Sequence, residues 1–386
     1  MSKSSSSSAV ARGSLSAGPE LPAASAEVAS ASVERSDQPA TPLVDLGWGP
    51  PFEVAFRDRF VDGAEPGRVA RVDRGALTIL THAGELRALV AAQLAHDPDP
   101  LKAPTVGDWV VLQGGLVTEV LPRRSAIVRG GAGSPGTPQV LAANVDKVFI
   151  VCSLEDRFRA RRLERLLVLA WQSGAAPVAV LTKADIAEDL AGAVEAAERL
   201  IGAGDVVAVS SVTGAGMDAV RTLLEPCTTV VLLGPSGAGK STLVNRLGGG
   251  GIDLATGEVR GDGKGRHTTT ARELVRLPSG ALLIDTPGLR ALALFDADEA
   301  IGDVFAEIGE LAAACRFSDC GHRSEPGCAI KGAIAAGTLS VERYTSFENL
   351  RLEQRRLTAL VGSREYAGER KRHKPFGKLT RNLGKR

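Results

Sequence analysis

The chain has 386 residues, of which 44% are hydrophobic and 24% charged, and its formal net charge at pH 7 is +1. This length suggests about two or three domains, and the apolar content is enough for real cores. No segment has the roughly 18 to 20 consecutive apolar residues that cross a bilayer, and none is of the signal-peptide type. We therefore expect a cytoplasmic protein without membrane contact.

The first 46 residues are rich in Ser, Ala, Pro and Glu and begin MSKSSSSSAV. They offer no periodic apolar face, so we predict a disordered leader over 1–46 and assign it no function.

Short alternating segments follow Pro51 and predict a small antiparallel barrel over 50–124. An OB-fold is the first choice and an SH3-like barrel the second. The segments are Glu53–Arg57, Arg68–Val72, Ala76–Thr81, Glu85–Val90, and those starting at Gly107 and Leu116. Aromatic side chains on OB-folds bind single-stranded nucleic acid. Those of this segment, which fit a core equally well, are Phe52, Phe56, Phe60 and Trp109.

Beyond a flexible stretch at 129–139, continuous apolar strands alternate with helices over 140–295. This pattern indicates a doubly wound parallel sheet, which binds ligands at the carboxyl ends of its strands. The expected strands are Val145–Ser153, Ala176–Leu181, Asp205–Ser210 and Thr229–Leu233. The expected helices are Arg159–Gln172, Ala191–Ile201 and Met217–Leu224.

The second of these strands ends in the tetrapeptide TKAD, from Thr182 to Asp185. A carboxylate at Asp185 can accept two hydrogen bonds from guanine, which adenine cannot supply, and leaving it unpaired penalises ATP. Lys183 is expected along the base, and Thr182 stands where most GTPases place Asn. SSVTG after the next strand fits a loop that touches guanine. The guanine-site residues predicted here are Thr182, Lys183, Ala184, Asp185, Ser210 and Ser211.

The fourth strand runs into GPSGAGKST, a phosphate loop at a strand-to-helix junction. Its glycines let backbone N–H groups point inward, and the following helix adds its positive end. Lys240 should reach the β- and γ-phosphates, Ser241 should bind magnesium and Thr242 should support the α-phosphate. A chance Gly-rich turn is the alternative. The predicted residues are Gly234, Pro235, Ser236, Gly237, Ala238, Gly239, Lys240, Ser241 and Thr242.

A mobile switch is predicted at GDGKGRHTTT, 261–270, ahead of DTPG at 285–288. Thr269, or alternatively Thr268, should reach magnesium and the γ-phosphate. Asp285 should hold magnesium through water, and the Gly288 N–H should sense the γ-phosphate. The predicted magnesium residues are therefore Ser241, Thr269 and Asp285.

Leu289 follows DTPG, where many GTPases carry the glutamine that positions the attacking water. Leucine cannot orient water, so we expect slow hydrolysis by the isolated protein. His267 is the internal candidate for this role because an imidazole can hydrogen-bond water near neutral pH. A solvated loop histidine is the alternative.

Four side chains with metal-ligand chemistry follow in the pattern C-x4-C-x-H-x5-C, within a predicted helical zinc-binding domain over 296–368. They are Cys315, Cys320, His322 and Cys328. Three thiolates and one imidazole complete tetrahedral zinc, so we predict one structural Zn²⁺, with redox thiols as the alternative. Cys152 and Cys227 lie in or beside strands and are expected in the core.

Positive charge is concentrated at the C-terminal end. Residues 351–386 hold twelve Lys or Arg against three Asp or Glu, whereas the rest of the chain holds 34 against 42. Neutralisation of phosphates with counterion release favours RNA at the basic tail, 369–386. A solvated tail is the alternative.

In an ordinary GTPase the phosphate loop comes before the base-reading tetrapeptide, whereas here TKAD precedes GPSGAGKST. We therefore predict a circularly permuted G domain. The barrel, this permutation, GRHTTT, DTPG and the Cys/His cluster together resemble the bacterial ribosome small-subunit-dependent GTPase A (RsgA) family, from about Pro50 onward. The short sequences that begin at Gly107 (GDWV), Gln139 (QVLAANVDKVFIV) and Arg343 (RYTSFENLRLE) also resemble this family.

The resemblance implies hydrolysis of GTP to GDP and phosphate, stimulated by the small ribosomal subunit, in late maturation of that subunit, with binding to its rRNA. It also implicates the histidine matching His267 in hydrolysis. We expect Mg²⁺ with GTP and a monomer. Two other classes stay open: a P-loop ATPase, which leaves TKAD unexplained, and a non-catalytic RNA-binding scaffold.

Overall fold

The computed structural model describes residues 41–59, 62–73, 75–129, 138–155, 158–202, 204–249, 272–285, 294 and 296–361. The first described element is the 3₁₀ helix η1 (Leu43–Leu46), at the end of the segment predicted as a disordered leader. It is ordered because Leu46 is only 2% exposed and belongs to the hydrophobic core.

A five-stranded barrel follows, as predicted. Its strands are β1 (Glu65–Asp73), β2 (Ala76–Thr81), β3 (Gly84–Val90), β4 (Trp109–Gln113) and β5 (Leu116–Val120). They are hydrogen-bonded in the order β1-β2-β3-β5-β4, and β4 pairs back onto β1. Apolar side chains such as Val69, Ile79 and Val110 fill the interior. The short helices α2 (Ala92–Ala95) and η2 (Pro100–Lys102) lie between β3 and β4 in the chain.

The segment Glu53–Arg57, expected as a strand, is instead part of helix α1 (Pro50–Arg57). Proline at the start favours a helix, and Phe52 and Phe56 are spaced to share one helix face. Phe52 is buried beside Trp109, with their ring centroids 5.7 Å apart. Both rings therefore belong to the core rather than to a nucleic-acid surface. Phe56 packs against the same core, and Phe60 lies outside the described residues.

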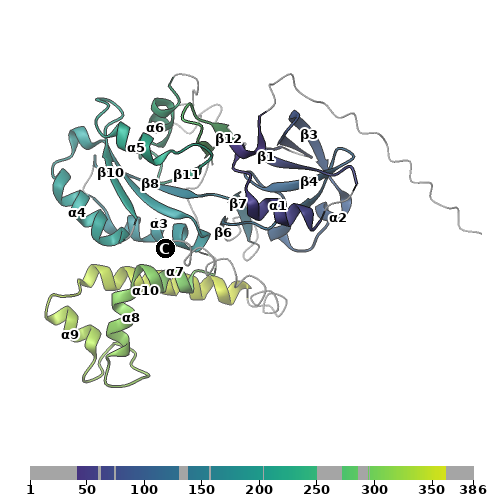
Figure 1. Ribbon diagram of the computed structural model, residues 1–386. Coiled ribbons are helices and arrows are strands. Elements are labelled where there is room, and N and C mark those ends of the chain that lie inside the picture. Colours follow the sequence, from purple (N-terminus) through teal and green to yellow (C-terminus); the bar gives the residue numbers. More distant parts are fainter. Residues whose placement is uncertain are drawn as a thin grey trace, which may run out of the picture. The chain divides into compact units, whose positions relative to one another are not determined.

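The expected parallel sheet is present in the G domain (Figure 1). Its strands are β8 (Lys147–Ser153), β9 (Ala176–Thr182), β10 (Asp205–Val209), β11 (Thr229–Leu233), β12 (Glu273–Arg276) and β13 (Leu282–Asp285). Their order is β10-β9-β8-β11-β13-β12, with β12 antiparallel to β13. Thus β8 to β10, which precede β11 in the chain, lie on one side of it, and the later strands lie on the other.

Helices cover both faces of this sheet. They are α3 (Ala160–Ser173), α4 (Leu190–Ile201), α5 (Met217–Leu223) and α6 (Lys240–Leu247), with the 3₁₀ helix η3 (Ala184–Ile186) after β9. Alternate strand residues face opposite ways, as in any β-strand. Val148 and Ile150 join the core that contains α3 and α4, whereas Phe149 and Val151 join the one that contains α5 and α6.

Two connections around the sheet were not predicted. Strand β12 pairs with β1 of the barrel at Glu273 and Arg71, so the two sheets are continuous over 11 strands. The expected flexible stretch at 129–139 is flanked by the hairpin strands β6 (Ala126–Arg129) and β7 (Gln139–Ala143). Residues 130–137 of that stretch lie outside the described part of the chain.

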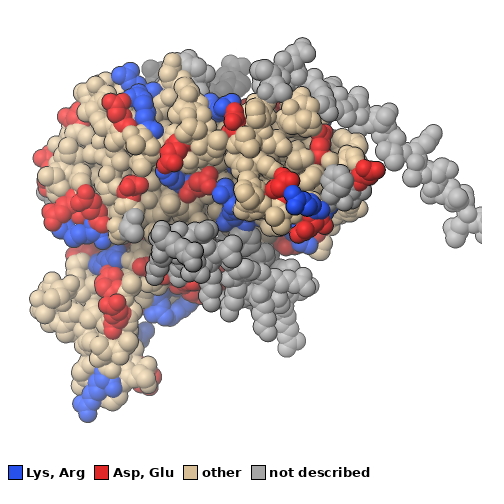
Figure 2. All heavy atoms as spheres, in the orientation of Figure 1, with Lys and Arg blue, Asp and Glu red and all other residues tan. Residues whose placement is uncertain are grey.

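The C-terminal described elements are helical: α7 (Asp298–Val304), α8 (Ala306–Ala313), α9 (Ala329–Ala335) and α10 (Val341–Val361). Arg343 of α10 joins them to α3, because its guanidinium contacts Glu164 at 3.0 Å and Glu307 at 2.7 Å. No helix in the described ranges is long and apolar enough to cross a membrane. On the face shown in Figure 2, Lys and Arg are interspersed with Asp and Glu.

Candidate functional site

The nucleotide motifs follow strands that end at one edge of the sheet. In the parallel register Thr182 of β9 lies beside Val209 of β10 and Ser153 of β8, and β11 is aligned with both β8 and β13. TKAD, SSVTG and the phosphate loop therefore leave the sheet at the same edge, at which Asp285, the first residue of DTPG, ends β13. This is the edge at which open α/β sheets bind their ligands.

The phosphate loop runs from β11 into α6, which begins at Lys240. Gly237 and Gly239 have φ values of +79° and +89°, in the left-handed region that favours glycine. A Cβ on Gly234 would lie 2.5 Å from the Val151 carbonyl oxygen, so this position has no room for a side chain. The loop is thus shaped by glycine and held close to β8.

Lys240 lies over the phosphate loop rather than pointing into solvent. Its Nζ donates hydrogen bonds to the carbonyl oxygens of Gly234, at 2.9 Å, and Pro235, at 2.7 Å. Ser241 and Thr242 occupy the first turn of α6, half-buried and exposed respectively. The cationic amine and the helix N-terminus therefore meet at one loop, an arrangement suited to an anion such as a phosphate group.

TKAD is joined to the phosphate loop through Thr182, which is 2% exposed. Its hydroxyl donates to the Ala238 carbonyl at 2.7 Å, so this side chain contacts the loop itself. Lys183 has a left-handed φ of +62°, and its amine forms an ion pair with Glu155. Asp185, in η3, is exposed, and Ala184 is half-buried.

The SSVTG segment forms a tight loop after β10. Ser210 is fully buried, and its hydroxyl oxygen accepts a hydrogen bond from the Thr213 N–H at 3.1 Å. Its backbone N–H donates to the Ala215 carbonyl at 2.9 Å. Gly216 ends the loop, where a Cβ would lie 2.0 Å from the Ala208 carbonyl oxygen. Ser211, the next residue after Ser210, is half-buried.

The γ-phosphate side of the predicted site is described only in part. Asp285 is the last residue of β13, and its strand places it at the shared edge. The residues expected at the switch and after DTPG lie outside the described part of the chain. They are His267, Thr268, Thr269, Gly288 and Leu289.

Sequence reasoning missed the partners that hold the motifs. Glu155, which pairs with Lys183, follows β8 by two positions and is an isolated acidic residue. The bond between Thr182 and Ala238 spans 56 positions. The sequence offers one general indication of such contacts: motifs that follow neighbouring parallel strands meet at the carboxyl ends of those strands.

The predicted metal ligands meet in one cluster, with one ligand atom of each of the four residues within 4.8 Å of the others. His322 Nδ1 lies 3.6 Å from both Cys315 Sγ and Cys328 Sγ, and these sulfurs are 4.0 Å apart. Ligands about 2.0 to 2.3 Å from a tetrahedral zinc lie about 3.5 to 3.8 Å from one another. The donor set and its spacing therefore fit zinc.

Glu325 braces the loop that carries these ligands. Its carboxylate accepts hydrogen bonds from the N–H groups of Gly321, Arg323 and Ser324 at 2.8 to 3.0 Å. Hydrogen bonds from its own N–H and from those of Arg323 and Ser324 lower the pKa of Glu325 to about 2. The carboxylate is therefore charged at neutral pH and organises the metal loop.

The other two cysteines, Cys152 and Cys227, lie outside the metal cluster. Cys152 is buried, as expected, and burial raises the pKa of its thiol to about 11. Cys227 is only half-buried, in a turn with φ of +64°. None of the five cysteines forms a disulfide.

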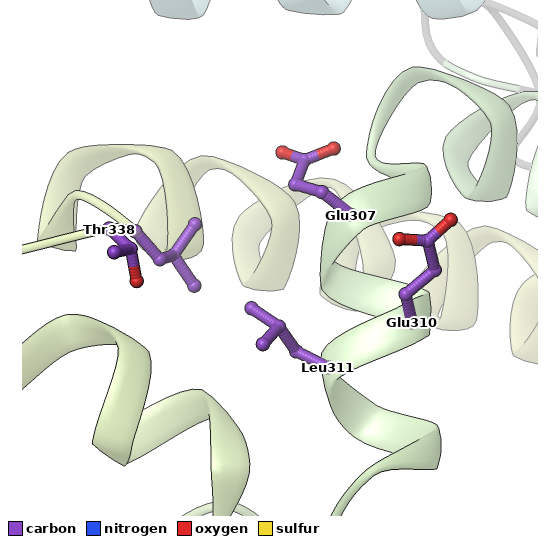
Figure 3. A pocket seen from close by; sticks show the side chains of 5 residues that line it. Glu307, Glu310, Leu311 and Thr338 are labelled. Carbon is purple, nitrogen blue, oxygen red and sulfur yellow. The ribbon is translucent and has the colours of Figure 1, made fainter.

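A pocket of about 340 Å³ lies among the C-terminal helices (Figure 3). Its lining residues are Glu307, Glu310, Leu311, Thr338 and Leu339. None of them belongs to a nucleotide motif or to the metal cluster, and Glu307 is paired with Arg343. We assign this pocket no ligand.

Comparisons with known proteins agree with this geometry. A family model described as RsgA GTPase matches residues 120–295. The chain is 45% identical over 346 residues to "Small ribosomal subunit biogenesis GTPase RsgA" of Streptomyces coelicolor, covering 87% of this chain and 93% of that protein. It is 41% identical over 363 residues to the protein of the same name in Opitutus terrae, covering 87% and 99%.

Two solved structures share the fold. YjeQ from Thermotoga maritima matches with a TM-score of 0.57 at 26% identity, covering 78% of this chain and 100% of that one. YloQ, described as a circularly permuted GTPase, matches with a TM-score of 0.52 at 24% identity, covering 76% and 96%. The fold is therefore that of solved structures, one of which is described as a circularly permuted GTPase.

Proposed function

Because this chain belongs to the RsgA family of small ribosomal subunit biogenesis GTPases, we propose that it hydrolyses GTP to GDP and phosphate during late maturation of the small subunit. The observation that carries the proposal is the hydrogen bond between Thr182 and Ala238. It joins the base-reading tetrapeptide to the phosphate loop although their order in the chain is reversed. A complete guanine nucleotide site is then possible in the permuted fold.

In this site Asp185 reads guanine, and the backbone of the phosphate loop holds the β-phosphate. Lys240 exchanges its two carbonyl partners for phosphate oxygens when the nucleotide enters, which is possible because both are weaker partners for a cation than a phosphate. Ser241, Thr269 and Asp285 are the candidates for the Mg²⁺ that would accompany GTP and neutralise charge on its phosphates.

Hydrolysis needs a water placed in line with the γ-phosphate. Leu289 cannot place it, so we assign this step to His267, helped by the docked small subunit. The Gly288 N–H would contact the γ-phosphate and register its loss. Turnover by the free protein is then slow, and turnover on the subunit is fast.

The Cys/His cluster would hold one structural Zn²⁺, since its four protein ligands leave no position for a water. The proposed partners are the small subunit and its rRNA, contacted in part by the basic tail, with the protein acting as a cytoplasmic monomer. The proposed parts of the chain are the barrel over 50–124, the G domain over 140–295, the zinc-binding helical domain over 296–368 and the basic tail over 369–386.

The test is turnover of GTP and of ATP, each alone, with purified small subunits, and with large subunits as a polyanion control. We expect GTP hydrolysis stimulated by small subunits only. ATP turnover equal to that of GTP would favour the P-loop ATPase class. Tight subunit binding without any stimulation would favour the RNA-binding scaffold and contradict the proposal.

A further inference from the structure

The barrel contacts the G domain through the strands that carry the phosphate-side motifs. Arg71 of β1 pairs with Glu273 of β12, and a Cβ on Gly107 would lie 3.0 Å from the side chain of Ile284 in β13. Arg68 of β1 reaches Thr229, the first residue of β11. In the chain, β12 follows the predicted switch, β13 ends at the first residue of DTPG, and β11 runs into the phosphate loop.

The Arg68 side chain, which makes one of these contacts, is almost fully buried, at 1% exposed. Its guanidinium donates to the Thr229 hydroxyl at 2.8 Å, to the Asn144 carbonyl at 3.3 Å and to the Gly107 carbonyl at 3.4 Å. It also donates to the carbonyl of Leu46. One side chain thus joins the N-terminal segment, the barrel, the segment after β7 and the phosphate-loop strand.

This link requires an arginine. Burial lowers the pKa of Arg68 to about 10, which leaves the group charged at neutral pH. A buried charge is stable only while its hydrogen-bond partners stay in place, so the barrel and the start of β11 must keep one geometry. A lysine has a single ammonium on a flexible stem and cannot reproduce a planar fork that serves four acceptors.

Thr229 is held by a second contact besides its hydrogen bond from Arg68. Its N–H donates to the Asp146 carboxylate at 2.8 Å, just before β8. The strand then runs without interruption from Thr229 to Leu233 and into Gly234. Arg68 therefore holds the start of the strand that leads to the phosphate loop, whereas none of its hydrogen bonds among the described residues goes to β9 or β10, which lead to the guanine motifs.

We propose that Arg68 is a positioning residue that couples the barrel to the phosphate side of the nucleotide site, so that engagement of the barrel changes the rate of hydrolysis more than it changes the affinity for GTP. The proposal rests on the GTPase function proposed above. In physical terms, a partner that holds the barrel fixes the orientation of β1, and Arg68 then fixes the start of β11.

The test uses the full-length protein and four variants. Thr229→Val removes the hydroxyl that accepts from Arg68 but keeps the branched shape, and Arg68→Lys keeps the charge but loses the fork. The double variant completes a cycle, and Arg87→Met, an exposed arginine on β3 of the same barrel, is the control. Thermal melting establishes that each variant is folded.

At saturating small subunits, we expect Thr229→Val and Arg68→Lys each to lower the stimulated kcat by about tenfold, the loss of one hydrogen bond to a charged group. The double variant should lose no more than either single one. GTP affinity and the preference for guanine should change by less than about twofold in all of them. Arg87→Met should be stimulated like the parent.

Three outcomes would overturn the coupling: normal stimulated kcat in Thr229→Val, losses that add in the double variant, or a loss of GTP affinity as large as the loss of kcat. The last would indicate a structural role only. Failure of the proposed function gives a different result, because the parent protein itself would then show no stimulation by small subunits.

Discussion

The hydroxyl of Thr182 donates to the carbonyl of Ala238 at 2.7 Å, so the tetrapeptide that we expect to read the base supports the phosphate loop directly. Thr182→Val removes this bond at nearly constant shape. We expect GTP and GDP affinities to fall together by about fivefold, since one neutral hydrogen bond contributes about 1 kcal/mol. Fluorescent-nucleotide titration measures both. Thr182→Ser keeps the hydroxyl and should bind normally; equal weakening in the two variants would contradict this role.

Asp185 is exposed in η3, just beyond the end of β9, where its carboxylate is available to a base. Asp185→Asn should weaken GTP and favour xanthosine triphosphate, because the 2-oxo group of xanthine suits an amide donor. Competition binding of the two nucleotides gives the selectivity. Glu188→Gln, a nearby exposed carboxylate outside the tetrapeptide, is the matched control. Unchanged GTP affinity in Asp185→Asn would remove TKAD from the site.

Strong local patterns allowed the sheet to be predicted from the sequence. Thr229–Leu233 has four consecutive apolar residues after its threonine, and its predicted bounds are those of β11. The alternation over Glu53–Arg57 predicts a strand, but the segment is helical in α1, which begins at Pro50. The pairing of Arg68 with Thr229 spans 161 positions and leaves no local signal. Long-range polar contacts of this kind follow from the tertiary fold alone.

Metal analysis should find one zinc per chain, because the cluster offers four ligands at tetrahedral spacing. Cys320→Ser should lose the metal and make residues 315–328 sensitive to protease, since metal binding contributes folding free energy there. Cys227→Ser, at a half-buried thiol outside the cluster, should retain it. Protein purified without chelator and found free of metal would refute the zinc assignment.

The carboxylate of Glu325 holds the metal loop through backbone N–H groups, and its pKa is lowered from 4.5 to about 2. A depressed folded-state pKa means that this contribution is present above about pH 4.5 and is lost as the pH falls toward 2. Glu325→Gln should therefore release zinc to a chelator faster than the parent at pH 7. Identical release rates in the two proteins would show that the brace is dispensable.

We expect stimulation by the small subunit to depend on two separable parts of the chain, His267 and the basic tail. Because Leu289 cannot orient water, docking should raise turnover by bringing His267 to the water rather than by tightening GTP binding. The tail, which carries most of the positive excess, should contribute affinity for the subunit through rRNA phosphates. One part then governs the chemical step and the other governs docking.

Deletion of residues 370–386 should weaken subunit binding in a salt-dependent manner, because fewer counterions are released on docking. His267→Ala should do the opposite: binding with a GTP analogue is kept, and stimulated turnover is lost, because imidazole is removed from the water. A two-by-two comparison of these changes, with sedimentation and phosphate release over a salt series, separates the roles. Normal binding of the deletion at every salt concentration would eliminate the tail as a docking element, and full stimulation of His267→Ala would eliminate the histidine from the chemical step.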